Sequence, residues 1–275
     1  MIRFVNNVKT AVLLALLFGV VLAAGLAIGG QQGLIIAFVL GLAMNFVAFF
    51  FSDKIAIAAM RGKLVDDKTE YAELVHMVNQ LADGANLPRP RIYVCPQQSP
   101  NAFATGRSPK KAAVAVTQGA FELLTYDELK GVMAHELAHV KNRDTLTSTI
   151  AATIAGAINF LTYMFMFGGR NRDIHPGIQI AILLLAPIAA ALIQMAISRS
   201  REFVADADGA EIAGSPNGLI SALQKLEAYS KGIPLESAPT QNHMFIVQPF
   251  SAGGLSNLFS THPATAKRIE KLRQA

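Results

Sequence analysis

The chain has 275 residues, a net charge of +5 and a single cysteine, with 52% hydrophobic against 16% charged residues. A mean hydropathy of +0.37 is unusual for a soluble protein and indicates membrane segments beside a smaller water-facing part. The basic residues lie next to apolar runs, so an acidic lipid surface explains the positive charge better than nucleic acid does. The lone Cys95 excludes an intrachain disulfide.

Two apolar stretches near the N-terminus, residues 10–28 and 34–51, are each about long enough to cross a bilayer as a helix. The short uncharged sequence GGQQG joins them, so we expect an N-terminal transmembrane hairpin over residues 1–53. The alternative is a cleaved signal peptide, which the second stretch disfavours because it follows at once. Basic residues flank the hairpin and are absent from its loop, which predicts that both of its ends lie in the cytoplasm.

The next region, residues 54–144, has the pattern of a water-facing domain and is predicted to form the first half of a cytoplasmic domain. Apolar residues recur at helical spacing over residues 69–85. Three short strand candidates follow, namely RIYVC at 91–95, NAFATG at 101–106 and AAVAV at 112–116. A helix, a small sheet and then another helix make an α+β fold.

The helix after the strand candidates carries the sequence HELAH. A capping box at residues 125–128 begins it, and we expect it to run from about residue 126 to residue 142. His135 and His139 are four residues apart, so they lie one turn above each other on one face. Each can therefore direct one ring nitrogen at the same ion.

This spacing suits zinc chemistry. Zinc accepts imidazole nitrogens at about 2 Å, prefers four ligands and lowers the pKa of a bound water towards 7. Glu136 is rotated by about 100° from His135, so it can lie beside the metal without binding it and accept a proton from the water. The structural alternative is a helix surface with two solvated histidines.

The third metal ligand must come from elsewhere, because a metzincin motif needs glycine and histidine where Asn142 and Thr145 stand. Our choice is Glu202, which shares a helix face with Asp206. Asp206 then accepts the N–H of a liganding imidazole and fixes the orientation of its ring. The two arginines of this segment suit a charged helix start leaving the membrane, namely Arg199 and Arg201. Rival ligands are Asp208, Glu211, His243 and His262.

Between these parts of the site lies a second membrane hairpin, predicted for residues 145–198, with apolar runs at 146–167 and 178–197. The alternative is a hairpin that only dips into the bilayer. A hairpin returns its two ends to one place, so it can bring His139 close to Glu202 although 62 residues separate them. The second half of the cytoplasmic domain then covers residues 199–275, and the site lies at the cytoplasmic membrane surface.

These segments resemble the HtpX family of integral-membrane zinc endopeptidases, which are related to the CAAX prenyl protease. The similarity covers nearly the whole chain, through its two hairpins and the segments NAFATG, HELAHVKNRD, SREFVADADGA and FSTHPATAKRIEKL. The resemblance implies an α+β membrane protein of about four transmembrane helices, with a mainly helical, zincin-like (gluzincin) metalloprotease domain that has a small β-sheet. It also implies a multi-pass protein of the bacterial inner membrane.

The resemblance carries functional roles onto this chain. It implies one Zn²⁺ per chain, with His135, His139 and Glu202 as ligands and Glu136 as the catalytic base. The active site would face the cytoplasm and serve quality control of damaged or misassembled membrane proteins.

Two further assignments follow from the resemblance. Asn101, Ala102 and Phe103 are similar to the edge strand on which gluzincin substrates add as an extended strand, the alternative being a plain turn. His262 stands before Pro263, a good first residue for the last helix, and would stabilise the developing oxyanion, the alternative being a helix cap. The loop of residues 233–259 has an apolar centre that could cover the cleft or touch lipid.

The leading interpretation is a zinc endopeptidase that acts on membrane-bound or unfolded polypeptides. An intramembrane zinc protease is the close rival, but charged residues flank HELAH and are costly at bilayer depth. A non-catalytic zinc-binding membrane scaffold needs no base, so Glu136 argues against it. A small-molecule hydrolase is disfavoured by the predicted edge strand, and no feature of the sequence indicates an oligomeric state.

Overall fold

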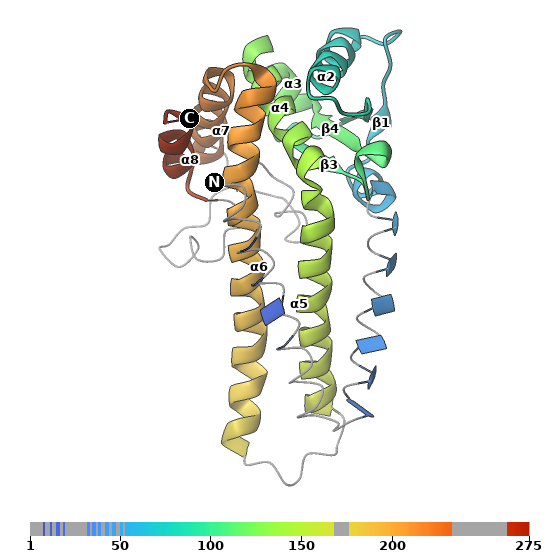
Figure 1. Cartoon of the computed structure of the whole chain (residues 1–275), viewed down its shortest axis with the longest axis vertical. Helices are drawn as coiled ribbons and strands as arrows, with labels where there is room; N and C mark the ends of the chain where they lie inside the picture. Colours follow the sequence, from blue (N-terminus) through green and yellow to red (C-terminus); the bar gives the residue numbers. More distant parts are fainter. Residues whose placement is uncertain are drawn as a thin grey trace. The chain divides into compact units, whose positions relative to one another are not determined.

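A computed structural model gives the fold of the chain. It describes residues 53–167, 176–232 and 263–274, together with Phe51 and scattered single residues before it. The chain divides into two compact units, which we call the long-helix unit (residues 1–50 and 147–200) and the α+β unit (residues 51–146 and 201–275). Figure 1 shows the elements of both.

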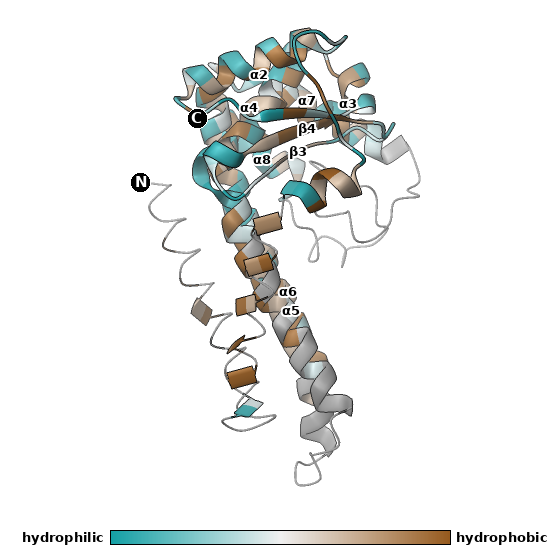
Figure 2. Ribbon diagram, turned by 90° about the vertical axis from the view of Figure 1, so that its right-hand side faces the viewer, coloured by the Kyte–Doolittle hydropathy of each residue, from teal (hydrophilic) through white to brown (hydrophobic). Residues whose placement is uncertain are grey.

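The long-helix unit contains most of α5 (Asp144–Phe167) and the first part of α6 (Pro176–Ala213). The two helices run side by side and bury small and aliphatic side chains such as Ile158 and Ala190 (Figures 1 and 2). The hairpin predicted for residues 1–53 lies largely outside the described residues. Among those that are described, no helix combines the length and the apolar composition needed to cross a membrane.

The α+β unit contains a four-stranded mixed sheet, in the order β1-β2-β4-β3. β2 and β4 are parallel, and β1 and β3 pair antiparallel to β2 and β4 respectively. The strands are β1 (Lys63–Leu64), β2 (Arg91–Cys95), β3 (Ala102–Thr105) and β4 (Ala113–Thr117). The three strand candidates are thus confirmed, with β2 at its predicted bounds, whereas the two-residue β1 was not predicted. In the described part of the sheet β3 is an outer strand.

Helix α2 (Ala72–Gly84) lies between β1 and β2 in sequence, and α3 (Gln118–Leu123) directly follows β4. The predicted start of α2 at residue 69 is wrong by three residues. The Thr69 hydroxyl donates to the Asp66 carbonyl, and the Asp66 carboxylate accepts from the Lys68 backbone N–H. These local bonds hold a turn where the first helical turn was expected. α3 was not predicted, and the Thr117 side chain caps it.

Helix α4 (Tyr126–Asn142) has both of its predicted ends, and the capping box of Thr125 and Glu128 is formed. The described part of the unit also contains the end of α6, α7 (Asn217–Gly232) and α8 (Thr265–Leu272). Pro263 was predicted as the first residue of the last helix, but α8 has Ala264 as its N-cap and begins two residues after the proline.

One hydrophobic core joins the sheet to the helices of the α+β unit. α4 packs against β3, α2 and α7, and α7 packs against α8. Buried side chains from these elements meet in the core, among them Leu74, Val78, Ile92, Val114, Val116, Val132, Met133, Leu137, Leu219, Leu223, Ile269 and Leu272. α4 therefore has its position fixed on several sides, which holds the residues of HELAH in place.

Candidate metal centre

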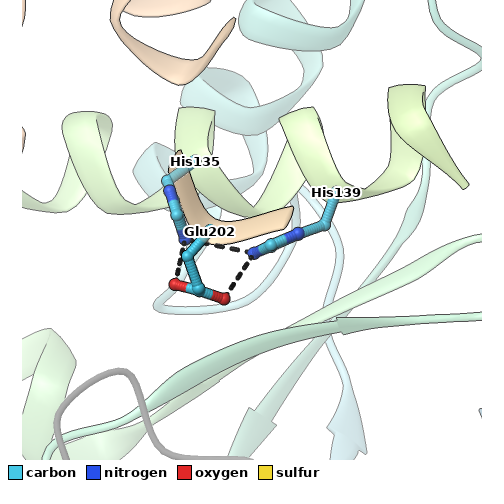
Figure 3. Close-up of side chains that lie close together, drawn as sticks. All are labelled: His135, His139 and Glu202. Carbon is cyan, nitrogen blue, oxygen red and sulfur yellow. Dashed lines mark hydrogen bonds and ion pairs between the residues drawn. The ribbon is translucent and has the colours of Figure 1, made fainter. Parts of the chain in front are cut away.

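Three potential ligands converge on one point beside α4. His135 and His139 lie one turn apart, with their Nε2 atoms 3.1 Å from each other. Glu202 reaches them from α6, with Oε2 3.7 Å from Nε2 of His135 and Oε1 3.5 Å from Nε2 of His139 (Figure 3). One ligand atom from each residue thus falls within 4.8 Å of the others.

This donor set fits a zinc-type ion. Two imidazole nitrogens, each about 2 Å from a tetrahedral metal, are about 3.3 Å apart, close to the observed separation of the two Nε2 atoms. Two imidazoles and a carboxylate are ligands that zinc accepts, and three protein ligands with one open position are typical of catalytic zinc sites. Among the described residues the cluster comprises these three groups.

A carboxylate and a guanidinium lie behind His135. Its Nδ1 is 3.1 Å from Oδ1 of Asp206, and Arg268 donates two hydrogen bonds to the same carboxylate, of 2.9 and 2.6 Å. Burial alone would raise the pKa of Asp206, but Arg268 and His135 outweigh it and lower the pKa to about 2. Arg268 is 1% exposed, and its Nη1 is 3.5 Å from Oε2 of Glu202. It therefore contributes a buried positive charge close to the two carboxylates.

His139 has a carboxylate at its own Nδ1. Oδ2 of Asp144 lies 2.8 Å from that atom. Burial lowers the pKa of His139, but its hydrogen bonds to the carboxylates of Asp144 and Glu202 outweigh this effect and raise the pKa well above its usual value. Both imidazoles thus have a carboxylate at Nδ1, which leaves their Nε2 atoms directed towards Glu202.

Glu136 is buried beside the cluster and is 4% exposed. Burial raises the pKa of its carboxyl group, while the two histidines and a hydrogen bond from the Ala104 backbone N–H act in the opposite direction. The carboxylate therefore lies between the metal ligands and strand β3. A group that accepts and returns a proton during peptide cleavage would need this location.

Comparison with known proteins identifies the family. Residues 68–275 match the model of peptidase family M48. The chain belongs to this family. It is 52% identical over 274 residues to "Protease HtpX homolog" of Methylibium petroleiphilum, which covers 97% of this chain and 96% of the relative. It is 51% identical over 276 residues to "Protease HtpX homolog" of Burkholderia thailandensis, with 98% and 96% covered.

A solved structure shows the same fold. The match is the crystal structure of S. mikatae Ste24p, with a TM-score of 0.61 and 19% sequence identity, over 98% of this chain and 66% of that chain. The predicted resemblance to the HtpX family and to the CAAX protease is thereby confirmed. As a member of family M48, the chain is a metalloprotease, and the cluster of two histidines and a glutamate is its possible metal site.

In this M48 chain a glycine brings α6 against the helix that carries HELAH. A Cβ atom on Gly209 would lie 2.8 Å from Cα of His135 and 3.0 Å from its backbone nitrogen. A side chain at position 209 would therefore push the two helices apart. The close approach is what lets Glu202, two turns earlier on α6, reach the histidines.

The remaining predicted site residues fall in different places. Asn101 immediately precedes β3 and is 0% exposed, while Ala102 and Phe103 are buried residues of β3 itself. The roles assigned to these residues stay predictions. His262 and His243, and the loop of residues 233–259, lie outside the described residues.

The rivals to Glu202 and the neighbouring arginine have other surroundings. Asp208 is fully buried and accepts a hydrogen bond of 2.7 Å from the Asn142 side chain, and it does not belong to the cluster. Glu211 is exposed on the same helix. Arg201, which the sequence suggested as part of a charged helix start leaving the membrane, is buried and forms an ion pair with Asp144.

Sequence reasoning missed Arg268 altogether. The only available signal was its place in α8, where it lies four residues before Leu272 and next to Ile269, on the face that the helix buries. An arginine on a buried helix face requires a partner, and carboxylates had already been singled out in the segment of residues 198–208.

Proposed function

We propose that the chain is a zinc-dependent, membrane-bound endopeptidase that cleaves misfolded or damaged membrane proteins, and unfolded proteins, on the cytoplasmic side. The observation that carries this proposal is the convergence of His135, His139 and Glu202 next to the buried carboxylate of Glu136. Membership of peptidase family M48 supports the reaction class.

The residues of the site have different roles in peptide hydrolysis. When bound, zinc would lower the pKa of a water molecule towards neutrality and polarise the peptide carbonyl. His135, His139 and Glu202 would hold the ion. Glu136 takes a proton from the attacking water and returns it to the leaving amine. The burial that raises the pKa of Glu136 favours the first of these two transfers, because it makes the carboxylate a stronger base towards the water.

Strand β3 supports an extended polypeptide as the substrate. It is an outer strand of the described sheet, and the N–H of Ala104 in that strand points at Glu136. A substrate that pairs with β3 as an added strand would pass the catalytic carboxylate. In this proposal Asn101 holds the substrate backbone, and His262 stabilises the oxyanion.

The membrane part of the proposal is supported by composition. The apolar stretches at 10–28, 34–51, 146–167 and 178–197 would form two hairpins in the bacterial inner membrane, and the positive charges around the first hairpin favour a cytoplasmic site.

The side of the membrane on which the α+β unit lies can be tested with Asp67→Cys, an exposed position in that unit. Burial raises the pKa of the native Cys95 to about 11, so Cys95 should stay unlabelled by a maleimide. Labelling of intact cells by an impermeant maleimide would contradict the cytoplasmic orientation.

The test of the enzymatic role is Glu136→Gln in the full chain, purified in detergent. We expect one zinc per chain in both proteins and a loss of casein cleavage of at least about 100-fold in the variant. Glu122→Gln, at an exposed glutamate, is the matched control and should cut like the parent. Cleavage by Glu136→Gln at the parent's rate would remove Glu136 from its role. If the parent binds zinc but cuts no protein substrate, the alternative of a non-catalytic zinc-binding membrane scaffold is favoured.

A further inference from the structure

The end of α4 has an unusual backbone conformation for a residue with a side chain. The helix ends at Asn142, and Arg143 adopts the left-handed conformation, with φ 55° and ψ 38°, before α5 begins at Asp144. This conformation is unfavourable for residues other than glycine. When such strain persists in a structure, it often marks a place where function depends on the local geometry.

The change of direction at Arg143 determines where Asp144 lies. In a continuous α-helix, a residue five positions after His139 would be rotated by about 140° and would point away from it. Because the helix is interrupted, Asp144 instead turns back, and its Oδ2 lies 2.8 Å from Nδ1 of His139. A carboxylate there accepts the ring N–H and leaves the lone pair of Nε2 available for a metal.

A second side chain holds the carboxylate of Asp144. The guanidinium of Arg201 donates to Oδ1 of Asp144 and also lies 3.3 Å from the carbonyl oxygen of Asn142. The side chains of Asp144 and Arg201 are 5% and 7% exposed, so solvent screens their attraction little. Arg201 directly precedes Glu202 on α6. The pair therefore connects the end of the helix that carries the histidines to the residue that supplies the third ligand.

We propose that Asp144 and Arg201 form a positioning pair for His139, and that the interruption of the helix at Arg143 is what makes the pair possible. Asp144 fixes the tautomer and the orientation of the ring, and Arg201 fixes Asp144. The inference rests on the proposed function, in that His139 is taken as a metal ligand. Neither residue of the pair belongs to the cluster of potential metal ligands in the described part of the chain.

The first test is the zinc affinity of Asp144→Asn, measured by competition with a chromophoric chelator on the full chain in detergent. We expect the dissociation constant for zinc to rise about 10- to 100-fold, the usual effect of removing a carboxylate that is hydrogen-bonded to a metal-binding imidazole. The visible absorption of Co²⁺-substituted protein should change as well. Asp127→Asn, an exposed aspartate near the start of the same helix, is the matched control and should leave both measurements unchanged.

Thermal unfolding separates this role from a merely structural one. A positioning pair predicts that Asp144→Asn narrows the difference in Tm between the zinc-loaded and the metal-free protein. A purely structural pair predicts that both Tm values fall equally and that the zinc affinity changes less than threefold. The second outcome would overturn the proposal.

Variants at Arg143 test the role of the backbone without touching the pair. Arg143→Gly accepts the left-handed conformation freely and should keep the parent's zinc affinity, whereas the β-branched Arg143→Val should weaken it. Equal affinities in both variants would contradict the role given to the interruption. If the parent binds zinc but cleaves no protein, the proposed function is contradicted while the positioning pair is still supported. A parent that binds no zinc would overturn both.

Discussion

The two imidazoles of the metal centre are supported from different parts of the chain. Each has an aspartate at Nδ1 and an arginine behind that aspartate. For His139 the aspartate is Asp144, only five residues along the chain, whereas for His135 it is Asp206. We call Asp144 with Arg201 the near support, and Asp206 with Arg268 the far support.

The difference in sequence distance matches a difference in depth. The side chain of His135 is 2% exposed and that of His139 is 16% exposed. The deeper imidazole receives its support from α6 and α8, which reach it only when the tertiary fold is complete. The shallower one receives its aspartate from the first residue of α5, directly after its own helix ends, and only its arginine from α6. Damage to the far support should therefore cost global stability, and damage to the near support should act first on metal binding.

The largest effect is expected from Arg268→Met, which breaks the far support. The variant leaves the carboxylates of Asp206 and Glu202 buried without the guanidinium, and breaking a buried ion pair in this way typically costs about 3–5 kcal/mol. The free energy of unfolding, from denaturant titration of the metal-free protein in detergent, should fall by this amount. Lys267→Met, at an exposed neighbour on α8, should change it little.

A double variant sharpens this prediction. Arg268→Met combined with Asp206→Asn removes the negative charge that the guanidinium had balanced, so it should regain part of the lost stability. If the single variant unfolds like the parent, the far support contributes nothing to the fold and the contrast between the two supports fails.

The sequence predicted the local parts of this centre well. Both ends of α4 were predicted because the capping box marks its start and HELAH lies on a single helical face. Glu202 and Asp206 were paired correctly on one helix face because residues four apart on a helix are neighbours. The strand candidates followed from short apolar runs between prolines and polar turns.

What the sequence could not predict depends on tertiary contacts or on backbone strain. Arg268 comes to Asp206 from an element 62 residues further on, and no spacing rule relates the two. Arg201 stands in a charged segment, where a solvated side chain is the ordinary expectation. Asp144 reaches His139 only because Arg143 adopts a conformation that its residue type disfavours.

An effect on stability between those of the other two substitutions is expected from Gly209→Ala, which moves α6 away from His135 without changing any charge. The new Cβ would lie 2.8 Å from Cα of His135, so the helices must separate, and such overpacking typically costs about 1–3 kcal/mol. Because Glu202 lies on the displaced helix, zinc affinity should fall too. Gly84→Ala is the control, since a Cβ at that helical glycine meets nothing within 4 Å. Unchanged zinc affinity in Gly209→Ala would show that Glu202 does not depend on this close approach.

The smallest effect on stability is expected from a substitution of Glu128. This carboxylate of α4 has hydrogen-bond partners both close in sequence and distant from it, and it lies outside the metal centre. It accepts hydrogen bonds from the Thr125 backbone N–H, from Ser221 and from Lys225. Burial opposes its ionisation, but these bonds outweigh burial and lower its pKa to about 2 from an ordinary value of 4.5. The ionised form is therefore favoured by folding, and its contribution is present above about pH 4.5 and is lost as the pH falls towards 2.

Glu128→Gln should therefore lower the free energy of unfolding by about 1 kcal/mol at pH 7. The difference from the parent should shrink as the pH falls below 4.5, because protonation of Glu128 makes the parent resemble the variant. Glu73→Gln, at an exposed glutamate of α2, should show no such convergence. Zinc affinity at neutral pH should stay at the parent's value, since neither support includes Glu128. A loss of zinc affinity in Glu128→Gln would show that any destabilisation of α4 weakens zinc binding. Effects on stability and on metal binding could then not be assigned separately to the far and the near support.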